Sequence, residues 1–264
     1  MVEEEITKDK KKSSFPTALK VILTIAAAVL LLMVILVVII STTDTFVLRG
    51  SGVLTTENRD VSDFDRISLS GQGTIVVDQT GKEGLKVTAE DNLIDRITTV
   101  VEGNTLKIEL KKERFFWSFW PTKKIEYHVS VDDLEQITIS GSGFIETDKL
   151  EADDFKIRVS GSGKGEMDIE VDSLELDISG SGNFIMSGKA EKQRIIISGS
   201  GNYEGKELKS DDTDITINGS GKGTVNASDS LDVSINGSGN IKYLGSPSIN
   251  QQISGSGKIS RFED

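Results

Sequence analysis

The stretch Ile137-Thr138-Ile139-Ser140-Gly141-Ser142-Gly143 contains the unit that decides the fold. Two apolar residues, mostly β-branched, precede each of the first six units at alternate positions, as Ile137 and Ile139 do here. This period of two is typical of a half-buried β-strand. The unit Ser/Asn-Gly-Ser-Gly recurs at intervals of 18–20 residues, beginning at Ser140, Ser160, Ser179, Ser198, Asn218, Asn236 and Ser254.

Each repeat therefore predicts a strand, a sharp bend and a second strand. A single repeat of this kind cannot bury its apolar face, so successive repeats must stack as the rungs of a parallel β-solenoid. Glycine is expected at the bends because it alone adopts positive φ without steric cost. The predicted structural corners are Gly141, Gly143, Gly161, Gly163, Gly180, Gly182, Gly199, Gly201, Gly219, Gly221, Gly237, Gly239, Gly255 and Gly257.

Residues 63–133 also alternate in hydrophobicity, but they lie outside the register of the repeats. Glycine-centred breaks, such as Gly103-Asn104, divide this segment into short strands and read as hairpin turns. We expect a small N-terminal antiparallel β module that covers one open end of the solenoid, because an uncovered end presents unpaired backbone groups.

Composition excludes several functional classes. The chain of 264 residues has no cysteine and one histidine, His128, so thiolate chemistry and multi-histidine metal sites are ruled out. Its net charge of −12 argues against binding to nucleic acid. Paired carboxylates occur at Asp153-Asp154 and Asp211-Asp212, but in turn-like stretches where solvated loop charges are the simpler interpretation. We predict no catalytic, cofactor-binding or metal-binding residues.

An apolar run at residues 21–40 contains no charged residue. A helix of this length spans about 30 Å, the thickness of the hydrocarbon core of a bilayer. Lysines precede the run, which predicts a single-pass protein of the cell membrane with a cytoplasmic N-terminus. The predicted organisation is a cytoplasmic tail at 1–20, a transmembrane helix at 21–40, a membrane-proximal linker at 41–62, the β module at 63–133 and the solenoid at 134–264.

An aromatic cluster interrupts the β module between basic residues. Two interpretations are open: a long hairpin tip folded back on the sheet, or an exposed patch that contacts a membrane or a partner. Tryptophan beside lysine suits the headgroup region of a bilayer. The candidate contact residues are Phe115, Phe116, Trp117, Phe119 and Trp120.

The two ends of the extracytoplasmic part resemble a known family. The run from Gly50-Ser51-Gly52 through Phe64, Ile67 and Gly71 is similar to the start of the "putative auto-transporter adhesin, head GIN domain" family, and the run from Ile235 to Gly257 is similar to its closing stretch. The resemblance covers about residues 47–262. It implies an all-β ectodomain, with a right-handed parallel β-helix, on prokaryotic envelope proteins.

These observations together favour a membrane-anchored extracytoplasmic protein that serves binding, adhesion or envelope scaffolding and is not an enzyme. Two alternatives stay open, a carbohydrate-active β-helix enzyme and a component of transmembrane or envelope-stress signalling. The expected partners are the membrane and either an envelope polysaccharide or a protein. A homo-oligomer is left open as well, and no cofactor is expected.

Overall fold

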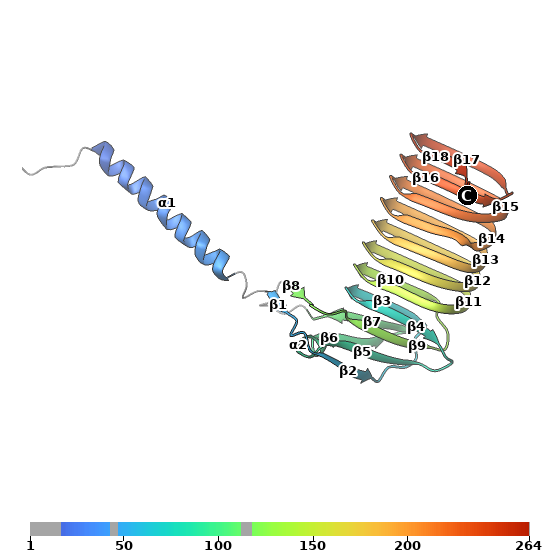
Figure 1. The fold of residues 1–264 in the computed structure, drawn as a ribbon, viewed down its shortest axis with the longest axis horizontal. Helices are drawn as coiled ribbons and strands as arrows, with labels where there is room; N and C mark the ends of the chain where they lie inside the picture. The colour runs from blue at the N-terminus through green and yellow to red at the C-terminus, as the bar shows by residue number, and fades with distance from the viewer. Residues whose placement is uncertain (1–16, 43–46, 112–117, 264) are drawn as a thin grey trace, which may run out of the picture. The chain divides into compact units, whose positions relative to one another are not determined.

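The computed structural model describes residues 17–42, 47–111 and 118–263. Within these ranges, the part of the chain from Arg49 onward forms one compact unit apart from residues 114–118. This unit is built on a 16-stranded sheet. Figure 1 shows its strands stacked as successive rungs from β3 to β18.

The repeats form the solenoid that their spacing predicts. At each repeat unit, one strand ends at the first glycine and the next strand begins directly after the second glycine. One further break, between Gly245 and Ser248, separates β16 from β17. The solenoid strands are β10 (Gln136–Gly141), β11 (Phe144–Gly161), β12 (Lys164–Gly180), β13 (Asn183–Gly199), β14 (Asn202–Gly219), β15 (Lys222–Gly237), β16 (Asn240–Gly245), β17 (Ser248–Gly255) and β18 (Lys258–Arg261).

Successive rungs pair in parallel, and equivalent residues of the repeats lie over one another. Ile137 pairs with Ile157 and Ile157 with Leu176, for example. All three side chains are buried, and each buried side chain of this size contributes about 1.5–3 kcal/mol through the hydrophobic effect. The same column continues with Ile195, Ile215 and Val233. The predicted apolar alternation thus forms a single continuous core along the stack.

The N-terminal strands continue this stack and are not a separate antiparallel module. β3 pairs in parallel with β10, and β4 pairs in parallel with both β11 and β9. Among the described pairs of the 16-stranded sheet, the antiparallel ones are the outer pairs β2–β5, β5–β9 and β6–β7. The prediction of a separate antiparallel module is therefore corrected. Ile67 and Leu69 lie in the same columns as the core residues of β10, so burial of their side chains favours parallel pairing of β3 with β10.

The remaining elements precede the repeats in the chain. They are α1 (Thr17–Thr42), β1 (Val47–Arg49), β2 (Leu54–Arg59), β3 (Arg66–Gly71), β4 (Thr74–Gln79), β5 (Gly84–Glu90), α2 (Asp91–Ile94), β6 (Ile97–Glu102), β7 (Thr105–Leu110), β8 (Ser118–Trp120) and β9 (Glu126–Val131).

The helix expected near the N-terminus is present as α1, but its assignment as a membrane span is corrected. Within the described ranges, no helix has the length and apolarity that a membrane crossing requires. The prediction of a transmembrane helix at 21–40 is therefore wrong, and the single-pass topology that was drawn from it has no support in the described residues. The fold class becomes an all-β solenoid preceded by helix α1.

Candidate binding surface

The first glycine of each repeat unit forms a column along one corner of the solenoid. Gly141, Gly161, Gly180, Gly199, Gly219, Gly237 and Gly255 all have φ between 119° and 133°. A Cβ atom placed on Gly161 would lie 2.6 Å from the carbonyl oxygen of Gly141 on the rung below. That oxygen accepts a hydrogen bond from the backbone N–H of Ser162 at 2.8 Å. Both the backbone conformation and the contact between rungs therefore require glycine here.

The second glycine of each unit is needed for a different reason. A Cβ atom on Gly201 would lie 2.8 Å from Cγ2 of Ile178, a core side chain of the preceding rung. These glycines are buried or nearly so and face the core, so they make room for the isoleucine and valine methyl groups inside the bend. The predicted residues in this column are Gly143, Gly163, Gly182, Gly201, Gly221, Gly239 and Gly257.

Short polar side chains form a column directly before the glycine corner. They stack at the rung spacing of about 4.8 Å, and we call them the corner column: Ser140, Ser160, Ser179, Ser198, Asn218, Asn236 and Ser254. From Ser160 to Ser254 these side chains are all exposed. The amide of Asn236 donates to Oδ1 of Asn218 at 2.9 Å, which shows that neighbouring members of the corner column can bond to each other.

A column of charged residues lies on the same wall, four residues before the corner column in five successive repeats: Lys156, Glu175, Arg194, Asp214 and Asp232. Its members neutralise each other between rungs: Lys156 pairs with Glu175, and Arg194 with Asp214 at 3.0 Å. Since the side chains of the second pair are 58% and 42% exposed, water screens the interaction, and such pairs contribute little to stability. The wall thus offers an uncharged strip of hydroxyl and amide groups together with a charged strip of two bases and three acids.

A buried polar network lies under the end of this wall, and the sequence did not predict it. Gln193 is 2% exposed and donates to Ser210 at 2.6 Å and to Thr213 at 3.1 Å. The hydroxyl of Tyr203 donates to Oε1 of Gln193 at 2.7 Å. Burial raises the pKa of Tyr203. Because these polar groups bond to one another, the network orders the bend without offering a free site.

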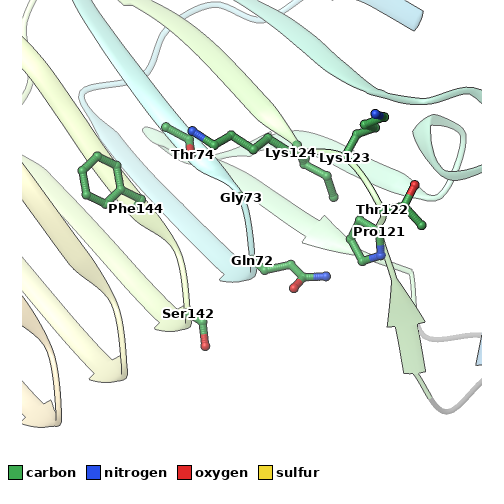
Figure 2. Close-up of a pocket in the computed structure, with 10 residues that line it drawn as sticks. Gln72, Gly73, Thr74, Pro121, Thr122, Lys123, Lys124, Ser142 and Phe144 are labelled. Atoms are coloured by element: carbon green, nitrogen blue, oxygen red, sulfur yellow. The ribbon is translucent and has the colours of Figure 1, made fainter. Parts of the chain in front are cut away.

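A hollow of about 410 Å³ lies at the first glycine corner (Figure 2). Two cationic residues, Lys123 and Lys124, contribute to its lining, together with Phe144 of β11. The other lining residues are Gln72, Gly73, Thr74, Pro121, Thr122, Ile125 and Ser142. Its mixed basic and apolar lining suits an amphipathic anion better than a sugar.

Glu90 at the end of β5 is the one buried carboxylate among the described residues, and sequence reasoning missed it. It is 1% exposed and accepts hydrogen bonds from the backbone N–H groups of Gly52 at 2.6 Å and Thr122 at 2.8 Å. A Cβ atom on Gly50 would overlap its carboxylate, which explains the glycine at that position. The only available signal was the pair Gly50 and Gly52, read above as part of a family resemblance and not as space for an acid.

The aromatic cluster is described only in part. Phe115, Phe116 and Trp117 lie outside the described residues. The backbone of Phe119 forms part of β8, and its side chain lies outside the described part of the chain. The side chain of Trp120 is 66% exposed. Its carbonyl oxygen accepts a hydrogen bond from Gly50 N–H at 3.0 Å, so the backbone at this position is held while the indole faces solvent.

The remaining titratable candidates are scattered over outward faces. His128 lies 3.7 Å from Glu126 on the outer face of β9, and both side chains are partly exposed. Asp153 and Asp154 line an open, acidic hollow together with Glu135. Among the described residues, no group of three or more acids and histidines has a geometry that could hold a metal ion.

Several solved structures share this fold. A putative adhesin from Bacteroides fragilis is 27% identical with a TM-score of 0.77, and the match covers 81% of this chain and all of that one. A putative lipid binding protein from Parabacteroides distasonis is 28% identical with a TM-score of 0.69, covering 82% of this chain and all of that one. A putative adhesin from Parabacteroides merdae, at 19% identity and a TM-score of 0.61, covers 82% of this chain and 99% of its own, and supports the fold alone.

The search of curated proteins found no match. The family model, in contrast, aligns with residues 63–247, which include β3 to β16 and nearly all of the glycine corners. The match thus covers well over half of the chain and contains the corner geometry described above. This chain belongs to the family described as "putative auto-transporter adhesin, head GIN domain".

Proposed function

We propose that this protein is a non-catalytic adhesive module of the cell envelope, which acts outside the cytoplasm and binds an extended, neutral polysaccharide along its corner column. The observation that carries the proposal is the corner column itself, which offers one exposed hydroxyl or amide on each rung from Ser160 to Ser254. A regular row of donors and acceptors matches a polymer that repeats its own hydroxyl groups at a similar interval.

Charge favours a neutral polymer over an anionic one. The chain carries a net charge of −12, so a strongly acidic polymer would be repelled at long range. In the charged column both bases are paired with acids, as Arg194 is with Asp214, so the column leaves no surplus of positive charge. Hydrogen bonding by uncharged groups is therefore the dominant recognition that this wall can offer.

The proposal includes no catalytic step. Its support is that the family is named for adhesion and that the acids considered above, such as Asp153 and Asp154, line open hollows. The carbohydrate-active alternative makes a distinct prediction: a protein that cleaves a glycan would lose this activity on Asp153→Asn or Asp154→Asn. Release of reducing ends from envelope glycan that is sensitive to either substitution would overturn the non-catalytic assignment.

Binding is tested by substitution within the corner column. Ser160→Glu with Ser198→Glu adds bulk and charge on alternate rungs, where both side chains are exposed. We expect at least a tenfold loss of affinity, about 1.4 kcal/mol, in co-sedimentation of the full chain with insoluble envelope polysaccharide. The matched control, Ile185→Glu with Thr224→Glu, places the same charges two rungs apart on the other wall and should leave binding unchanged.

Two treatments of the envelope material identify the class of partner. Periodate, which oxidises vicinal diols of sugars, should abolish binding, and protease should leave it intact. If protease abolishes binding and periodate does not, the partner is a protein and the polysaccharide proposal fails. Equal loss of binding in the corner-column variant and its control would also refute it.

A second candidate function is supported by exposed apolar side chains near β8. Trp120 is 66% exposed, and Val53 and Leu54 are 59% and 51% exposed. Lys123 and Lys124 lie a few residues further along the chain, and the combination of tryptophan with lysine is typical of contact with lipid headgroups. Under this proposal, Trp120→Ser should lower the partitioning of the protein onto anionic vesicles, whereas Val100→Ser, which removes an exposed valine elsewhere, should not.

A further inference from the structure

The last rung of the solenoid leaves part of the core uncovered. The register between β15 and β17 places Ile249, Gln251 and Ile253 over the buried residues Leu231, Val233 and Ile235. Ile249 and Ile253 are each 39% exposed. Within the described ranges, β17 pairs with no strand besides β15, so one backbone edge of β17 is open. Figure 1 shows β17 at the end of the stack farthest from the N-terminal strands.

This edge lacks the features that normally keep an open strand from pairing. Natural edges are guarded by charged side chains, by proline within the strand or by bulges. The other edge at this end, β18, carries Lys258 and Arg261, but residues 248–255 include no charge and no proline. The charged column also stops here, because Asn250 takes the place of an acid or base and donates to Asp232 at 2.9 Å.

The sequence of β17 is nearly the same in both directions. Ser248-Ile249-Asn250-Gln251-Gln252-Ile253-Ser254 has Gln251 at its centre, and the sole asymmetry is asparagine on one side against glutamine on the other. In an antiparallel pair centred on Gln251, Ile249 would face Ile253 of the second copy, and Gln251 would face its own counterpart. Directly opposed residues point to the same side of a sheet, so the isoleucines would cover each other and the amides would hydrogen-bond.

We propose that two copies of this chain associate end to end through antiparallel pairing of β17 with β17, about a twofold axis at Gln251. Such an interface is isologous, since the same strand serves both partners. An uncharged edge is where two chains with a net charge of −12 repel each other least. The charged end of the chain is held on the other wall, where Phe262 N–H donates to Tyr243 O at 2.8 Å. The inference does not depend on the proposed ligand.

Disulfide trapping tests the register directly, because the natural chain has no cysteine. Opposed residues in an antiparallel pair have Cα atoms about 4.5–5.5 Å apart, which is within the range for a disulfide. The full-length Gln251→Cys variant should therefore form a covalent dimer on mild oxidation. In Ser254→Cys, the matched control on the same strand, the two cysteines would lie roughly 20 Å apart, and the yield of dimer should be at least tenfold lower.

A second measurement separates this interface from any association through α1. Light scattering on the full chain should give twice the monomer mass of 28.6 kDa, and Ile249→Lys should return it to the monomer. Ile185→Lys replaces an isoleucine that is 40% exposed on a paired strand and should leave the dimer intact. The proposal is overturned if the natural chain is monomeric, if Ile249→Lys does not alter the dimer, or if both cysteine variants cross-link equally.

Discussion

Glu90 and Thr122 are joined by two hydrogen bonds, although 31 residues lie between them in the chain. The backbone N–H of Thr122 donates to Oε2 of Glu90 at 2.8 Å, and its hydroxyl donates to Oε1 at 2.5 Å. The N–H of Gly52 donates to the same carboxylate at 2.6 Å. One buried acid therefore fastens the segments before β2 and after β8 to the end of β5.

The protonation of Glu90 follows from these contacts. Burial by itself would raise its pKa, but hydrogen bonds from the side chain and backbone of Thr122, and from the backbone of Gly52 and Lys123, outweigh burial. Its pKa therefore lies below the usual value of 4.5. A carboxyl group whose pKa is lower in the folded chain stabilises the fold above the usual pKa, and this stabilisation is lost as pH falls through the folded-state pKa.

Glu90→Gln is accordingly expected to lower stability at pH 7 and to reduce the loss of stability on acidification below pH 4.5. The amide keeps the size of the side chain but replaces one acceptor oxygen by a donor, which faces N–H groups that then lack a partner. Urea unfolding at a series of pH values measures both effects. Glu57→Gln, which changes a carboxylate that is 37% exposed, is the control. Parallel pH profiles for the natural chain and Glu90→Gln would refute the assigned role.

Three glycine-to-alanine substitutions should differ in their effect on stability. Gly161→Ala should destabilise the protein by more than about 4 kcal/mol, because it combines positive φ with a clash against the rung below. Gly103 has φ of 62° but open space around it, so Gly103→Ala should cost only about 1–2 kcal/mol for the backbone conformation. Gly84, with open space and no positive φ, should accept alanine without loss. Midpoints of urea unfolding that do not follow this order would contradict the explanation.

The buried network around Gln193 predicts that removal of one hydroxyl group lowers the stability of the protein. Tyr203→Phe removes the donor to Oε1 of Gln193 and should destabilise the protein by about 1–3 kcal/mol. Since burial raises the pKa of Tyr203 above its usual value of 10.0, the natural chain should also lose stability as pH rises above 10.0, and Tyr203→Phe should lack this contribution. Tyr243→Phe, at a half-buried tyrosine, is the control for both measurements. An unchanged stability of Tyr203→Phe would show that Gln193 does not need this donor.

Neighbouring residues of β13 should differ greatly in their effect on stability. Ile195 is fully buried, and Ile195→Ala should cost about 2–5 kcal/mol. Arg194, one residue earlier, points outward and pairs with Asp214 while 58% exposed, so Arg194→Ala should cost no more than about 1 kcal/mol. Thermal unfolding at low and high salt measures both, and only the small effect of Arg194→Ala should depend on salt. A large, salt-sensitive loss for Arg194→Ala would assign a structural role to the charged column.

The stacking of the corner column could be predicted from sequence because its members belong to the repeat, although no binding role was predicted for it. Ser179 and Asn218 stand at equivalent positions of their units, so stacking the units brings them into one column. Trp120 was identified by composition, but its exposure is a property of the folded chain. No local pattern marks Glu90, whose partners come from separate segments of the chain. The membrane assignment of residues 21–40 rested on the length and apolarity of the run and on the lysines before it, and no helix of the described residues meets the requirements for a membrane crossing.

The amino-acid sequence by itself determined the solenoid, because a rung of nearly constant length with glycine at each bend and alternating apolar residues can bury its core only by stacking on its own copies. Tertiary structure alone decided how the stack ends. At the N-terminal end, β3 and β4 join the rungs in parallel, because their apolar residues complete columns that begin in other strands. At the other end, the edge of β17 is open because, within the described part of the chain, no strand pairs with the side of β17 that faces away from β15.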